Sequence, residues 1–187
     1  LYISEKDTKQ AEKYLSKFAY LMRYYLDSSF TSNVLLKDEM DGLKLNIELE
    51  HLRLNKNFDF EVKACDDIEP EETEIPPMLA QPFIENSIKH GLRIKPRDGQ
   101  LKVAFNMVKD GVMRCVVEDN GIGREAASRV RKTTNGYASR GIDITISRLK
   151  NIWKDDYRDE YLTITDLKTE TGEAAGTRVE LFFPYRF

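Results

Sequence analysis

The chain has 187 residues, 41% of them hydrophobic, and a formal net charge of −3 from 29 basic and 32 acidic residues. This composition is typical of a globular protein, and the interspersed charges exclude a strongly basic chain that would bind nucleic acid directly. The two cysteines, Cys65 and Cys115, lie far apart, which argues against a disulfide framework and favours a reducing compartment. No apolar run approaches the roughly 18 residues of a membrane span. Because the chain begins with Leu1 rather than Met, we expect a piece of a longer protein.

Two amphipathic helices are predicted first, over residues 9–27 and 36–55. Both have apolar residues at the i, i+3, i+4, i+7 spacing of one helical face. The run 28–33 separates them, so we expect an antiparallel hairpin. Such a hairpin cannot bury both stripes by itself and must pack on something else, a second copy of the chain being one option. The first stripe consists of Ala11, Tyr14, Leu15, Phe18, Leu21, Met22 and Tyr25, and the second of Leu36, Met40, Leu43, Ile47 and Leu54.

Residues 56–187 are predicted to form an α+β domain, preceded by a helical region over residues 1–55. We expect a two-layer sandwich in which helices cover one side of an antiparallel sheet. A helix should run from Pro77 to about Leu92, with Pro76 and Pro77 in its first positions, and another over 142–153. The polar stretch 119–141 is predicted to be a long mobile loop. Strands are expected at 58–64, 100–108, 112–119, 161–167 and 177–184.

The helix from Pro77 to Leu92 carries polar side chains among its apolar ones. Asn86, Lys89 and His90 fall on one stripe with Pro82, at i, i+4, i+7 and i+8. An amide oxygen suits magnesium, and an amine three residues later can meet phosphate as a point charge. The alternative is the solvated stripe of a half-buried helix, and this segment alone does not decide between them.

Three glycine motifs follow in order, each with a simple alternative. In "EDNGIG", Gly121 and Gly123 allow close backbone approach to a ligand, and Asp119 can accept a hydrogen bond from an exocyclic amine; a plain turn is the alternative. In "SRGIDI", Gly141 allows a ligand near a helix N-terminus, although Ser139 could simply cap that helix. The third motif, "GTRVEL", enters the last strand at Gly176 and is weak by itself.

Taken together, these four motifs resemble the ATP-binding domain shared by histidine kinases, gyrase, Hsp90 and MutL, the Bergerat or GHKL fold, over roughly residues 56–187. The segments "YLSKFAYLMRYYLDSS", "VLLKDEMDGLKLNIELEHLRL" and "IPPMLAQPFIENSIKHGL" are similar to LytS/YehU-type sensor histidine kinases. "SRGIDITISRLKNI" is similar to versions from Bacteroidetes members. The resemblance therefore extends over nearly the whole chain.

This resemblance implies ATP and magnesium as cofactors. Asn86 would coordinate the metal, Lys89 and His90 would meet or position phosphate, and Asp119 would take the adenine amino group. Gly121 and Gly123 would hinge the loop, and Thr177 would support a water network around Asp119. A lid from Arg124 to Arg140 would close over the nucleotide, with Arg129, Arg131 and Lys132 as phosphate contacts. The remaining nucleotide contacts would come from Arg140, Gly141, Ile142 and Gly176.

The sequence departs from the family pattern at two places. Ser139 and Ile144 replace the first glycine and the asparagine of the G-x-G-L-x-N loop, which puts the phosphate contacts there in doubt. Pro82 stands where the ATPase branches have a glutamate that activates water. Glu85 could assist a proton or the metal shell, but on an α-helix it points about 100° away from Asn86. We therefore expect a phosphotransferase rather than a hydrolase.

The predicted function is the ATP-binding catalytic core of a two-component sensor histidine kinase. In this family the phosphorylated histidine lies in an "NPHFLFN"-like segment upstream of the matching region, and His51 is expected to be structural. The resemblance implies a homodimer of the full-length protein, a response regulator for which the LytTR type is one option, and a cytoplasmic position in a protein anchored in the inner membrane, with no membrane contact by this piece. Two alternatives stay open: a GHKL-type ATPase or clamp, and a degenerate kinase that acts as a nucleotide- or partner-binding module.

Overall fold

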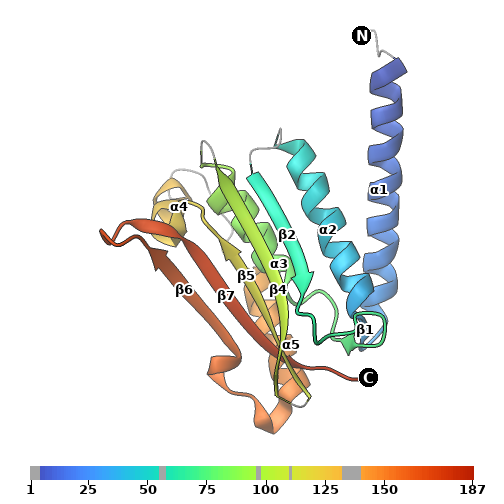
Figure 1. Cartoon of the computed structure of the whole chain (residues 1–187), viewed down its shortest axis with the longest axis vertical. Coiled ribbons are helices and arrows are strands. Elements are labelled where there is room, and N and C mark those ends of the chain that lie inside the picture. Colours follow the sequence, from blue (N-terminus) through green and yellow to red (C-terminus); the bar gives the residue numbers. More distant parts are fainter. Residues whose placement is uncertain (1–4, 55–57, 96–97, 110, 132–139) are drawn as a thin grey trace.

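The computed structural model describes residues 5–54, 58–95, 98–109, 111–131 and 140–187. Two helices, α1 (Glu5–Ser29) and α2 (Leu36–Arg53), run antiparallel at one side of the molecule and are joined through the short strand β1 (Val34–Leu35) (Figure 1). The predicted hairpin is therefore confirmed. No helix in these five segments is both long and apolar enough to cross a membrane.

A five-stranded sheet forms the centre of the molecule, in the order β2-β4-β5-β7-β6. β2 runs parallel to β4, with Phe60 opposite Leu101, whereas all the other pairs are antiparallel. The prediction of a purely antiparallel sheet is thus wrong at this edge, because the chain crosses over between β2 and β4 through a helical segment, as parallel neighbours require. The strands are β2 (Phe58–Ala64), β4 (Gly99–Lys109), β5 (Val112–Asp119), β6 (Leu162–Lys168) and β7 (Ala174–Pro184).

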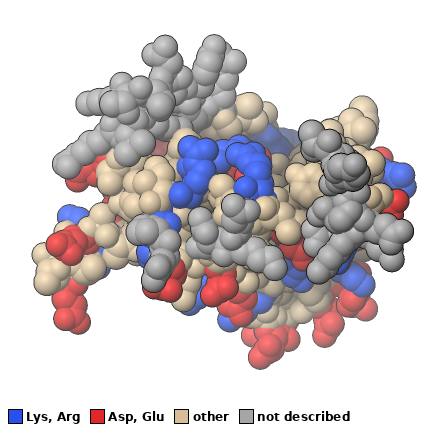
Figure 2. Space-filling model, turned by 90° about the horizontal axis from the view of Figure 1, so that it is seen from above, with Lys and Arg blue, Asp and Glu red and all other residues tan. Residues whose placement is uncertain are grey.

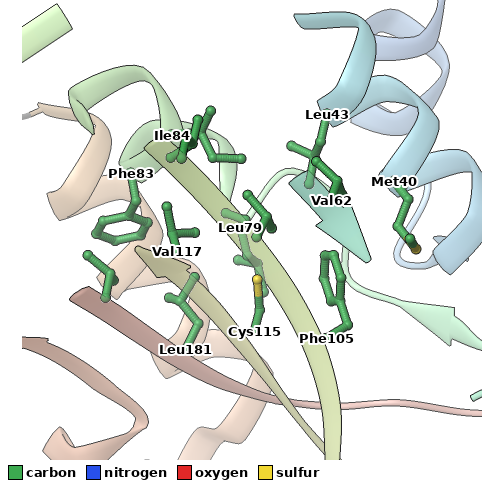
Figure 3. Close-up of a cluster of buried hydrophobic side chains, with 14 of the residues drawn as sticks. Met40, Leu43, Val62, Leu79, Phe83, Ile84, Phe105, Cys115, Val117 and Leu181 are labelled. Carbon is green, nitrogen blue, oxygen red and sulfur yellow. The ribbon is translucent and has the colours of Figure 1, made fainter. Parts of the chain in front are cut away.

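Helices cover one face of this sheet, which confirms the predicted α+β class and the two layers. Figure 3 shows Met40 and Leu43 of α2 beside Val62 of β2 and Phe105 of β4. These side chains belong to the same buried cluster as Leu149 of α5 (Arg140–Trp153). The apolar core therefore continues from α2 into the sheet, and the domain boundary between residues 55 and 56 stays a prediction.

The opposite face of the sheet carries charged side chains that pair across strands. Arg178 of β7 lies 2.7 Å from Glu118 of β5, and Arg114 lies 3.5 Å from Glu180. On the face seen from above in Figure 2, basic and acidic side chains are also interspersed. The mixed charge of the sequence is thus mixed in space on this face.

The helix expected from Pro77 to Leu92 begins later and changes its winding. It starts as α3 (Gln81–Asn86), because Met78 has a φ of +55° that no helix continues, so Pro82 rather than Pro76 or Pro77 occupies the first turn. From Ser87 to Leu92 it is a π-helix, η1, which ends with the Arg93 N–H donating to the Ile88 carbonyl at 2.9 Å. This wider winding changes which side chains share a face.

The stretch expected to be a mobile loop, 119–141, is partly helical. α4 (Gly123–Arg131) occupies its first half, and its sequence is rich in the good helix formers Ala, Arg and Glu. The loop prediction is wrong for these residues, and residues 132–139 lie outside the described part of the chain. The helix expected at 142–153 is confirmed as α5.

Short elements complete the chain. β3 (Glu74–Ile75) pairs with β1, and Glu74 also bridges to Arg186 near the C-terminus through two backbone hydrogen bonds of 2.8 and 3.0 Å. The 3₁₀ turns η2 (Lys154–Asp156) and η3 (Asp159–Tyr161) lead from α5 into β6. The connection between α1 and α2 is thus linked, through β1 and β3, to Arg186 near the C-terminus.

Candidate functional site

A cavity of about 280 Å³ lies between the α3–η1 segment, α4, α5 and the sheet. Five separate parts of the sequence line it, residues from each of the four motifs and Ile164 of β6. Its lining from α3 and η1 consists of Phe83, Asn86, Ser87, His90 and Gly91. The other lining residues are Asp119, Gly123, Arg124, Ala127, Ser128, Ile142, Ile164, Thr177 and Val179.

Asp119 is the most buried charged group in this lining, with 2% of its surface exposed. The Ser87 hydroxyl donates to its Oδ2 at 2.7 Å and the Gly121 N–H donates to its Oδ1 at 2.8 Å. Burial raises the pKa of Asp119, and hydrogen bonds from Ser87 and from the backbone of Gly121 and Thr177 partly offset this rise. The result is an oriented acceptor in a low-dielectric cavity, suited to an amine donor.

Two glycines of the predicted motifs make room for this carboxylate. A Cβ on Gly121 would lie 2.6 Å from the Gly91 Cα and 2.8 Å from Asp119 Oδ1. Gly176 has a φ of +128°, and a Cβ there would lie 1.9 Å from the Asp119 carbonyl oxygen. Neither position accepts a side chain, so these glycines pack the backbone around Asp119 rather than line the cavity.

The polar stripe of the predicted helix is divided by the change in winding. Asn86 and His90 line the cavity. Lys89 instead contacts Glu85 at 2.6 Å, and Gln81 donates to the other oxygen of Glu85 at 3.0 Å. The structure therefore groups Lys89 with Glu85 outside the lining, and their catalytic and phosphate roles remain predictions.

The donor set fits a magnesium ion that is shared with a nucleotide. The described residues contain no group of three or more His, Cys, Asp or Glu side chains that could hold a metal by themselves. Magnesium usually keeps several waters and takes only one or two protein ligands beside substrate phosphates. The Asn86 amide oxygen in the cavity wall is compatible with that arrangement.

The start of α5 lies against the start of α3. A Cβ on Gly141 would approach the Pro82 Cβ to 3.1 Å, and the neighbouring Ile142 lines the cavity. Arg140 begins α5, but its predicted contacts, like those of Ser139, Arg129, Arg131 and Lys132, fall on side chains outside the described part of the structure.

Some lining residues were not among the predicted ligand contacts. Ser87 directly follows Asn86, but α-helical spacing places it off the polar stripe. Arg124 was predicted only as part of the lid. Its guanidinium forms two hydrogen bonds of 2.7 Å with Asp166 on β6, which raise the pKa of Arg124 and lower that of Asp166. The sequence contained no local signal for this pair, whose members are 42 positions apart.

The comparisons with known proteins find similarity to histidine kinases, in sequence over part of the chain and in fold over most of it. Residues 1–58 match the sequence model of the family described as "Histidine kinase". The mycobacterial sensor histidine kinase MprB superposes with a TM-score of 0.52 at 15% identity, over 82% of this chain and 97% of that one. The histidine kinase domain of the blue-light-activated kinase from Erythrobacter litoralis EL346 gives 0.53 at 16% identity, over 91% and 74%. At these identities the superpositions show the fold, which is that of a histidine kinase catalytic domain.

Curated relatives narrow the resemblance to LytS. The chain is 32% identical to the sensor protein LytS of Oceanobacillus iheyensis over 120 residues, 64% of this chain and 20% of that protein. It is 26% identical to LytS of Staphylococcus epidermidis over 117 residues, 63% and 19%. The sensor histidine kinase/phosphatase LytS of Staphylococcus aureus is 25% identical over 117 residues, 63% of this chain and 20% of that protein. The chain thus spans about a fifth of the length of these relatives. It is similar to the catalytic region of LytS-type sensor histidine kinases, whereas the comparisons give no support to the Bacteroidetes resemblance.

Proposed function

We propose that this chain binds ATP with magnesium in the described cavity and transfers the γ-phosphoryl group to a histidine of a two-component sensor kinase. The observation that carries the proposal is the buried Asp119 carboxylate, which is oriented by Ser87 and Gly121 at the point where the glycine motifs meet. This acceptor would hold the adenine amino group. Asn86 and His90, in the same lining, would face the phosphates.

In the transfer step, a neutral imidazole nitrogen attacks the γ-phosphorus while the bond from phosphorus to the bridging oxygen breaks. ADP leaves with that electron pair, and the phosphohistidine gives up its extra proton to solvent. Bound magnesium would neutralise phosphate charge, and the protein mainly has to position the reactants. Asn86 would hold the metal, while Lys89 could reach the phosphates only by leaving Glu85.

The surroundings of Asn86 favour transfer over hydrolysis. Pro82, one turn earlier, packs near Gly141 and offers no base to activate water. Glu85 already accepts hydrogen bonds from Gln81 and Lys89. A carboxylate held in this way is a poor candidate for a general base.

The acceptor is proposed to be a histidine other than His51. The His51 ring packs edge-to-face against Phe58, with ring centroids 5.0 Å apart, and lies 5.8 Å from Phe60. These contacts are those of a structural side chain at the junction of α2 and β2. The resemblance to LytS suggests an acceptor in a part of the longer protein outside this chain.

We further propose a homodimer, built on the exposed apolar residues of α1, and a cognate response regulator as the next phosphoryl acceptor. The regulator could be of the LytTR type. The chain would be the cytoplasmic part of a membrane-anchored sensor. These assignments rest on the similarity to sensor protein LytS.

Nucleotide titrations of the purified chain with and without magnesium test the proposal. Asp119→Asn should abolish ATP binding, whereas Asp59→Asn, the same change at an exposed position of β2, should not. Asn86→Ala should remove the magnesium dependence of the affinity, with Asn106→Ala as its control. Transfer would be followed with radiolabelled ATP and an "NPHFLFN"-bearing acceptor fragment.

Each alternative predicts a different result. Steady phosphate release by the chain alone would favour a GHKL-type ATPase. No ATP binding at millimolar concentration would contradict both enzymatic functions and leave a partner-binding module. Tight binding by the Asp119→Asn variant would contradict the adenine role of Asp119.

A further inference from the structure

A second buried carboxylate lies away from the cavity, where α1, α2 and the segment before α3 meet. Glu39 of α2 has 2% of its surface exposed. The Met78 N–H donates to both of its oxygens, at 3.0 and 3.1 Å, and the Tyr24 hydroxyl of α1 donates to Oε2. One side chain therefore binds two separate parts of the chain at once.

The contact with Met78 fixes the residues that begin α3. Met78 has a φ of +55°, a conformation that needs support from its surroundings. The following Leu79 and Ala80 are buried, and the Ala80 carbonyl accepts the N–H groups of Phe83 and Ile84 at 3.1 and 3.2 Å. The first turn of α3 thus starts from a backbone that Glu39 holds, and Asn86 ends the same helix.

The contact with Tyr24 fixes α1 at the same point. A Cβ on Gly42 of α2 would lie 2.6 Å from the Tyr24 ring, so the two helices approach closely here. At the next residue, Tyr25, burial and the charge of Glu85 raise the pKa of the phenol. The C-terminal half of α1 is therefore held against α2 at the same carboxylate that binds Met78.

Burying the carboxylate of Glu39 in the core is unfavourable, because the charged form loses its hydration. Burial raises the pKa of Glu39, against the hydrogen bonds from Tyr24 and Met78 and the positive charge of Arg148 on α5. Burial likewise lowers the pKa of Arg148. An apolar side chain would avoid the desolvation, but it could not accept hydrogen bonds from α1 and from the Met78 backbone together.

We propose that Glu39 is a positioning residue of the nucleotide site, because it joins α1 to the turn that starts α3. Through this contact the packing of α1 against α2 is coupled to the affinity for nucleotide. This inference rests on the proposed ATP binding. The coupling is reciprocal: what loosens α1 weakens nucleotide binding, and bound nucleotide holds α1 more firmly.

Two conservative variants and one control test it on the full 187-residue chain. Glu39→Gln keeps the shape but weakens the acceptor, and Tyr24→Phe removes only the hydroxyl. The control is Lys17→Met, which removes the ion pair between Lys17 of α1 and Glu48 of α2 without touching Met78. Amide hydrogen exchange of residues 78–86 is measured without ligand, and ATP affinity is measured by titration.

We expect the two junction variants, Glu39→Gln and Tyr24→Phe, to speed amide hydrogen exchange at residues 78–86. Both should also weaken ATP binding on the order of fivefold or more. Lys17→Met should change neither quantity. In the unaltered chain and in Lys17→Met, magnesium and ATP should slow exchange in the last turns of α1. Tyr24→Phe should lose this protection, which a purely local structural role would not produce.

Unchanged exchange at residues 78–86 in both junction variants would overturn the inference, whether or not ATP binds. Equal ATP affinities in Tyr24→Phe and the unaltered chain would also overturn it. If the unaltered chain binds no ATP, the proposed function fails and the coupling to nucleotide fails with it. If Glu39→Gln does not fold, the comparison of Tyr24→Phe with Lys17→Met decides.

Discussion

The helices α1 and α2 have similar apolar spacing but opposite surroundings. On α1, Leu15 is 67% and Phe18 is 46% exposed. On α2, Ile47 is fully buried and belongs to the same core as the sheet. Periodicity therefore predicts that a helix has an apolar face, but it does not tell which surface covers that face.

The two helices are attached to the rest of the molecule in different ways. α2 packs on the sheet through its buried residues, whereas α1 is held at its C-terminal half, where Tyr24 binds Glu39. The exposed stripe of α1 is too apolar for a surface that stays in water, which supports the proposed second copy. Three predictions test this comparison.

The largest expected effect is on the core side. Ile47→Ala should destabilise the chain by about 2–5 kcal/mol, because it opens a cavity beneath α2. Leu15→Ala should change the free energy of unfolding by less than about 0.5 kcal/mol at a concentration where the chain is monomeric. Urea unfolding measures both values. Equal losses would mean that α1 and α2 belong to one packed unit.

A smaller effect concerns the buried carboxyl group of Glu39 on α2. The pKa of Glu39 is raised in the folded chain, so between the unfolded value of about 4.3 and the raised value the folded state holds the extra proton. Stability should therefore fall as pH rises through this window, by up to about 1.4 kcal/mol per pH unit. Glu39→Gln should remove this part of the slope, and Leu15→Ala should keep it. Unfolding curves recorded from pH 4 upward show which occurs; an unaltered slope in Glu39→Gln would contradict the assignment.

The smallest effect on stability should accompany a clear effect on association. Phe18→Ser should leave the unfolding free energy of the monomer within about 0.5 kcal/mol, since the side chain is already half exposed. It should weaken self-association, because it removes apolar area from the proposed interface. Sedimentation at several concentrations measures this, with Val108→Ser, an exposed apolar position on β4, as control. Equal weakening by both variants would place the interface elsewhere.

Most of the fold could be predicted from the sequence, because strand alternation and helix periodicity are local signals. The parallel pairing of β2 with β4 could not be, since it depends on where the chain returns after α3. The start of α3 was placed too early because Pro77 suits a helix start, whereas the backbone of Met78, held by Glu39 39 residues away, decides it.

For the site, the glycine motifs and Asp119 could be predicted because they are local in the sequence. Within a few residues the chain supplies both the carboxylate and the glycines that allow a close backbone approach. Ser87 and Gly91 were not predicted as lining residues. Both lie in the π-helical segment, and the sequence contains no pattern that predicts this winding. From α-helical spacing, Lys89 was predicted to contact phosphate, whereas in the structure it contacts Glu85. The roles of these residues at a bound nucleotide are still predictions.

The π-helix η1 also has a consequence for length variation. A π turn is an α-helix with one residue too many, so deleting one residue between Ser87 and Gly91 would let the segment return to ordinary winding. Because the wider π turn absorbs the additional residue, the residues after the deletion would keep nearly the same orientation relative to Asn86. Gly91 would therefore stay beside Gly121, where a Cβ on Gly121 would come within 2.6 Å of the Gly91 Cα. The wide turn thus lets the segment hold one more residue between Asn86 and Gly91 without changing how the two glycines pack, a change of length that a regular α-helix would not tolerate.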